Sequence, residues 1–87
     1  MVMDIYKLSM FVRQHVENFN HCKLYEQNGE KIAYQKGILY GIQLLAKGMN
    51  YDIRYIYSDE GFVTYFEVES FNFQPLFLKT KVDASFS

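Results

Sequence analysis

The stretch YDIRYIYSDEGFVTYFEVES, residues 51–70, decides the fold of this chain. Two runs of aromatic and β-branched residues flank the sequence Ser-Asp-Glu-Gly. Such runs favour β-strands, and the sequence between them holds turn-forming residues and a glycine that accepts a positive φ angle. The pattern therefore predicts a central antiparallel β-hairpin over residues 51–69.

The register of this hairpin follows from the two faces that it creates. A four-residue loop at 58–61 pairs Ile53 with Phe66 and gathers the large apolar side chains on one face. A three-residue loop would set the apolar side of one strand against the acids of the other, so we expect the four-residue loop. The apolar face would then hold Tyr51, Ile53, Tyr55, Tyr57, Phe62, Phe66 and Val68, interrupted by Thr64, and the other face would hold Asp52, Arg54, Glu67 and Glu69 together with Ile56, Val63 and Tyr65.

After the hairpin, residues 71–82 predict a third strand at the edge of the sheet. Pro75 cannot donate a backbone hydrogen bond, and Lys79 and Lys81 are typical of a protected edge. Residues 83–87 are expected to form a loose tail.

Before the hairpin, the chain predicts a first helix that begins after Asp4 and ends near Asn20. Asp4 is a good N-cap, and apolar residues recur every three or four positions behind it. We expect Arg13, Glu17 and Asn20 on the opposite, polar side. Residues 21–29 contain the turn sequence Asn-Gly. They could pair as a short hairpin, but we favour a simple connection to a second helix.

The second helix is expected from about Glu30 to Lys47, with Gly48 as its C-terminal stop. It is apolar almost all round, which is typical of a helix buried on more than one side. Gly37 and Gly41 lie in its apolar arc and predict close packing. We favour a groove for the aromatic rings of the hairpin, with a dimer contact or a ligand approach as alternatives.

These elements predict an α+β fold, with two helices packed on a small antiparallel sheet in the order ααβββ. The 87 residues are expected to form a single domain, 1–87, because chains of this length hold one core. A homodimer is expected as well, since the second helix is apolar on two sides and the sheet is small.

Composition narrows the function classes. The net charge of −1 argues against a general nucleic-acid binder, whose domains are usually basic. Cys22 is the only cysteine, which excludes an intramolecular disulfide and fits a reducing compartment. No stretch reads as a signal peptide or a membrane span. We therefore expect a cytoplasmic protein that does not associate with membranes.

The chain contains no recognisable catalytic or phosphate-binding motif. His15, His21 and Cys22 have the wrong spacing for one helical face and lack further ligands for a tetrahedral metal site. His21 beside Cys22 does not make a nucleophile and base, because adjacent residues rarely adopt that geometry. We expect no catalytic residue, no metal and no cofactor.

The remaining signals concern contact surfaces. A partner-binding surface is predicted on the hairpin, from its acids and its surplus aromatic residues. An alternative is nucleic-acid association through the lysines of the second helix, and another is a small ligand bound near its glycines. The predicted partner-binding residues are Asp52, Arg54, Tyr65, Glu67 and Glu69, and the alternative nucleic-acid contacts are Lys31, Lys36 and Lys47.

The segment around AYQKGILYGIQLL, residues 30–48, resembles tyrosine-rich helices of short uncharacterised proteins from low-GC Gram-positive bacteria and their phages. The resemblance implies a prophage or mobile-element gene and carries over no site residue. The function expected from the sequence is a non-enzymatic interaction or regulatory protein. One concrete form is a phage-encoded inhibitor of a host enzyme or defence complex.

Overall fold

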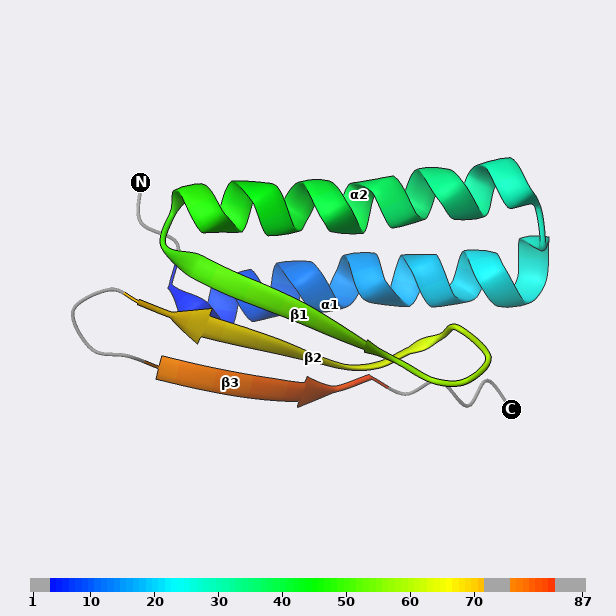
Figure 1. Ribbon diagram of the computed structural model, residues 1–87. Helices are drawn as coiled ribbons and strands as arrows, with labels where there is room; N and C mark the ends of the chain where they lie inside the picture. Colours follow the sequence, from blue (N-terminus) through cyan, green and yellow to red (C-terminus); the bar gives the residue numbers. More distant parts are fainter. Residues whose placement is uncertain (1–3, 72–75, 83–87) are drawn as a thin grey trace.

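The computed structural model describes residues 4–71 and 76–82. Two helices, α1 (Ile5–His21) and α2 (Gly29–Gly48), precede three strands. The strands β1 (Tyr51–Tyr57), β2 (Val63–Ser70) and β3 (Leu76–Lys81) form an antiparallel sheet in the order β1-β2-β3. Both helices pack on one face of the sheet (Figure 1). The predicted α+β arrangement, ααβββ, is confirmed.

The hydrophobic core lies between the helices and the inner face of the sheet. The apolar stripe of α1 is buried there as predicted, and Asp4 caps the helix by accepting the N–H of Lys7 at 2.8 Å. Burial of such side chains is the main stabilising term of the fold. The core cluster consists of Ile5, Leu8, Val12, Val16, Phe19, Leu39, Ile42, Ala46, Tyr51, Ile53, Val63, Phe66, Val68 and Val82.

The connection between the helices is a π-helical turn, Cys22–Glu26, that continues α1. Gln27 ends the turn with a left-handed backbone, φ 50°. The Asn28 side chain then caps α2 by accepting the N–H groups of Glu30 and Lys31. The favoured connection is therefore confirmed, and the short hairpin is excluded because this segment belongs to helical turns and a cap.

The end of α2 differs in detail from the prediction. Gly48 is the last residue of the helix, and the positive φ angle after it belongs to Asn50, at 64°. Asparagine tolerates the left-handed region better than other non-glycine residues. The left-handed residue therefore lies two positions after the predicted stop at Gly48, and β1 begins at Tyr51, as predicted.

The hairpin separates its faces largely as predicted, but its loop is different. The N–H of Ser58 donates to the carbonyl of Phe62 at 2.7 Å, which leaves a three-residue loop, 59–61. Gly61 supplies the positive φ angle, at 87°. Along the strands, Ile53 pairs with Val68 rather than with Phe66. The four-residue loop and its register are therefore wrong.

A β-bulge explains why the three-residue loop does not mix the faces. Ile56 pairs with Tyr65 and Tyr57 with Val63, so Thr64 is the extra residue on β2. One extra residue reverses the alternation of side chains. Val63 is consequently fully buried, although we had placed it on the outer face.

Asn20 is a further correction. The residue is fully buried, and its amide makes paired hydrogen bonds with the backbone of Val63, each 2.9 Å long. Position 20 follows Val16 by four residues and so lies close to the apolar stripe of α1 rather than opposite it. The two hydrogen bonds fasten the end of α1 to β2 next to the bulge.

The third strand is an edge strand, as predicted, and pairs only with β2 in the described sheet. Lys79 and Lys81 are exposed on it. Pro75 and the predicted tail, 83–87, lie outside the described residues. Neither helix of the described chain combines the length and the apolar character that crossing a membrane requires.

Candidate functional site

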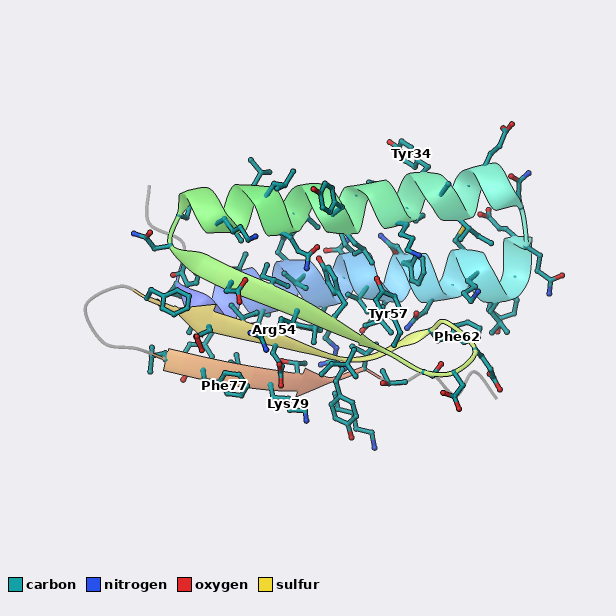
Figure 2. All side chains as sticks on the ribbon, in the orientation of Figure 1. Tyr34, Arg54, Tyr57, Phe62, Phe77 and Lys79 are labelled. Atoms are coloured by element: carbon teal, nitrogen blue, oxygen red, sulfur yellow. The ribbon has the colours of Figure 1, made fainter. Side chains whose placement is uncertain are left out.

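The candidate site is the outer face of the sheet, which points away from both helices. The pairing of the strands brings all the predicted partner-binding residues onto this face. Figure 2 shows Phe77 and Lys79 projecting from β3 on the side away from the helices. The outer face consists of Asp52, Arg54, Ile56, Tyr65, Glu67, Glu69, Phe77, Lys79 and Lys81.

The middle of the outer face is a row of alternating charges. Arg54 on β1 lies opposite Glu67 on β2, and Glu67 lies opposite Lys79 on β3. Cross-strand pairs of opposite charge stabilise a sheet by a few tenths to about 1 kcal/mol. Glu67 therefore lies between two cations of the neighbouring strands, where its charge favours the pairing.

The corner of the outer face next to this row is acidic. Asp52 lies directly opposite Glu69, an unfavourable pairing of like charges. The Arg54 guanidinium offsets part of this repulsion, because its Nε lies 3.7 Å from a carboxylate oxygen of Asp52. On its other side Glu69 lies opposite Phe77, a residue that is 58% exposed.

The opposite corner is basic and aromatic. The Nζ of Lys79 lies 4.7 Å from the centroid of the Tyr65 ring, a cation–π contact, and Lys81 pairs with Tyr65 across the strands. The acids of the outer face are balanced by the basic side chains, so its formal charges cancel. The hairpin sequence by itself predicts an acidic surface, because the balancing lysines belong to β3 and lie outside the hairpin.

A shallow hollow of about 60 Å³ opens between Asp52, Arg54, Glu67, Glu69 and Phe77. Ligand pockets for drug-sized molecules are several times larger, roughly 300–1,000 Å³. The hollow has room for no more than the tip of one side chain. A broader, open depression lies elsewhere, beside the hairpin loop, lined by Lys23, Leu24, Gln27, Ile32, Glu60 and Phe62.

The outward side of α2 is a second exposed surface. Tyr34 and Tyr40 are 70% and 62% exposed, and Leu44 and Leu45 are 52% and 71% exposed. A Cβ added at Gly37 or Gly41 would meet nothing within 4 Å among the described residues. The predicted intramolecular groove is therefore wrong, because the aromatic rings of the hairpin pack against the other side of this helix and against α1.

The lysines proposed for nucleic-acid contact do not form one patch. Lys31 lies 3.4 Å from a carboxylate oxygen of Glu26, and the Nζ of Lys36 lies 5.8 Å from the ring centroid of Tyr57. Lys47 belongs to the last turn of α2, more than two turns beyond Lys36. Nucleic-acid binding normally uses a cluster of cations on one face. This arrangement gives the alternative no additional support.

The residues with reactive side chains are held apart. His15 stacks edge-on against Phe11 and His21 lies against Tyr25, so the two imidazoles have separate aromatic neighbours. The pKa of the Cys22 thiol is raised mainly by its hydrogen bond to the Glu26 carboxylate and to a lesser degree by its burial. The raised pKa makes the thiol a weaker nucleophile. The described residues contain no group of His, Cys, Asp and Glu suited to hold a metal ion.

The part of the outer face that β3 supplies was not among the predicted partner-binding residues. Phe77, Lys79 and Lys81 alternate along β3 and therefore share one side of that strand. This alternation was a readable signal, but its meaning depends on how β3 is aligned with β2. Comparison with protein-family models, curated proteins and solved structures finds no match to this chain.

Proposed function

We propose that the protein is a non-enzymatic interaction protein that binds another protein through the outer face of the sheet. The observation that carries the proposal is the exposed ring of Phe77 beside a hollow with charged walls. Protein interfaces are enriched in such aromatic residues, and complementary charges fix the orientation of the partner. The outer face offers both an apolar anchor and a distinct pattern of charge.

The charge pattern of the outer face describes the partner that would fit it. The partner presents a basic group to the corner formed by Asp52 and Glu69, an apolar side chain to Phe77, and an acidic group to Lys79 and Lys81. We propose that this partner is a host protein in the cytoplasm. A phage-encoded inhibitor of a host enzyme or defence complex is one concrete form, supported by the resemblance of residues 30–48. We also propose that the protein acts as a homodimer.

Substitutions on the outer face test this function. Glu69→Lys places a cation opposite Asp52, so it changes the surface while improving a cross-strand pair. Phe77→Ser removes the exposed ring. Glu67→Lys is less suitable, because it would place three cations in the row formed with Arg54 and Lys79. Glu60→Lys, an equal change of charge in the exposed hairpin loop, is the matched control.

The measurement is affinity capture from a lysate of a low-GC Gram-positive bacterium, with each variant as bait, with and without nuclease. We expect one stoichiometric protein to be retained by the wild-type chain and by Glu60→Lys, and lost with Glu69→Lys and Phe77→Ser. Retention by all four baits would refute the outer face as the binding surface. Recovery that disappears with nuclease would favour the nucleic-acid alternative.

A further inference from the structure

We infer that α2 pairs with α2 of a second copy of this chain, in an antiparallel arrangement, through its outward side. This inference rests on the proposed homodimer and assigns the surface, the orientation and the register of the contact. Its starting point is that the outward side of α2 is apolar and exposed, whereas the opposite side is buried in the core. Figure 2 shows Tyr34 projecting from this outward side, away from the sheet.

The outward side contains a seam with the spacing of a coiled coil. In a coiled coil the contact positions recur at alternating steps of three and four residues. The residues of α2 that follow these steps lie in line along the exposed side of the helix, and none of them is buried. The seam consists of Glu30, Ala33, Gly37, Tyr40, Leu44 and Lys47.

The charges at the ends of the seam select the antiparallel orientation. Glu30 lies in the first turn of α2 and Lys47 in the last turn, and the seam positions between them are uncharged. A parallel pair would place Glu30 beside Glu30 and Lys47 beside Lys47. An antiparallel pair places each Glu30 beside the Lys47 of the other copy, which is an attractive contact at both ends.

The same register matches small residues with large ones. When Glu30 faces Lys47 of the other copy, Gly37 faces Tyr40 and Ala33 faces Leu44. The lack of any neighbour within 4 Å of a Cβ at Gly37 leaves room for an incoming tyrosine ring. A two-fold axis repeats each of these matches, as a closed dimer requires. Charge and shape therefore specify one and the same alignment.

The exposed area limits the pair to a dimer of modest affinity. Tyr34, Tyr40, Leu44 and Leu45 are each more than half exposed. At these exposures, the four side chains offer roughly 500 Å² per copy. Because Tyr34 and Leu45 lie beside the seam and not in it, two copies would bury at most roughly 1,000 Å² through these side chains, which is the lower limit for a specific interface. We therefore expect a dimer that dissociates on dilution.

Sedimentation equilibrium of the full chain, from micromolar to millimolar concentration, tests the pairing. We expect the wild-type chain to dimerise and Tyr40→Glu to weaken the dimer by at least about tenfold. Tyr6→Glu is the matched control, since Tyr6 is 65% exposed on α1, and it should leave the association unchanged. Circular dichroism would verify that each variant retains its fold.

Charge reversal tests the orientation and the register. Glu30→Lys and Lys47→Glu should each weaken the dimer by about fivefold, because each disturbs both end contacts. The double variant should restore the wild-type affinity. A wild-type chain that stays monomeric at millimolar concentration would overturn the inference, as would a double variant weaker than both single ones.

The result is separable from the binding of a host protein. Glu69→Lys and Phe77→Ser lie on the outer face of the sheet and should leave the dimer intact. Loss of the dimer in these two variants, with Tyr40→Glu still dimeric, would place the self-contact on the sheet and contradict the inference. Capture of a partner that survives Tyr40→Glu would leave the proposed function standing by itself.

Discussion

The two sides of α2 are similar in composition and opposite in environment. On the inward side Leu39, Ile42 and Ala46 are almost completely buried. On the outward side Tyr40 and Leu44 are more than half exposed. The comparison teaches that the apolar character of a helix reports how much surface is available for burial. It does not indicate whether that surface is buried by residues of the same chain.

The inward side is distinguished by its polar connections to β1 as well as by its burial. The Tyr55 hydroxyl donates to the carbonyl of Leu39 at 2.8 Å. The Gln43 side chain donates to the carbonyl of Ile53, also at 2.8 Å. Directional bonds of this kind hold α2 in one rotational setting over the sheet. They thereby fix which residues of the helix face outward.

The largest expected effect comes from breaking the inward side. Leu39 is 1% exposed, so Leu39→Ala should lower the free energy of unfolding by about 2–5 kcal/mol through lost burial and a residual cavity. Leu44→Ala on the outward side should change it by less than about 0.5 kcal/mol. Urea denaturation of dilute, monomeric protein provides the measurement. Similar losses for the two leucines would show that the outward side is covered within the chain.

The faces of the hairpin could be predicted from the sequence because alternation has a period of two. The length of the loop could not be predicted in this way. A three-residue loop with a bulge at Thr64 places residues 65–69 on the same faces as the four-residue loop that we expected. Periodicity alone does not distinguish these solutions, which differ in the backbone of Gly61 and in the burial of Val63. The role of Asn20 was missed for a related reason, because a polar residue was assigned to the polar side.

The site shows a similar division. The sequence placed Asp52, Glu67 and Glu69 on one face correctly, but the balancing lysines depend on the register of β3 against β2. For Gly37 and Gly41 the sequence predicted close packing. It could not decide whether that contact is made within the chain, because this depends on how α2 is rotated over β1.

A smaller effect is expected from the hydroxyl that fixes this rotation. Tyr55→Phe removes the hydrogen bond to Leu39 and should lower the free energy of unfolding by about 1 kcal/mol at neutral pH. Tyr34→Phe removes an exposed hydroxyl on α2 and should have almost no effect on the free energy of unfolding. Thermal denaturation of the two variants beside the wild type gives the comparison. Equal stability of both variants would mean that the Tyr55 bond contributes nothing.

The same variant predicts a change in pH dependence. Burial, assisted by neighbouring Tyr57, raises the pKa of Tyr55 in the folded protein. Its contribution to stability is therefore complete below the unfolded pKa of about 10 and is lost as the pH rises above that value. The wild-type chain should lose more stability than Tyr55→Phe in this alkaline range. Parallel curves for the two proteins would contradict the burial of this hydroxyl.

The smallest expected effect has opposite signs in the monomer and in the dimer. Gly37 has an ordinary helical backbone and open space around it, so Gly37→Ala should stabilise the monomer by about 0.5–1 kcal/mol. In the proposed antiparallel pair the added methyl group would meet Tyr40 of the other copy and weaken association. Gly61→Ala is the contrasting control, because a φ angle of 87° strains any residue with a Cβ and makes the substitution destabilising. A Gly37→Ala chain that is both more stable and a better dimer would show that this glycine is not at a close contact, and the outward side of α2 would then need a different explanation.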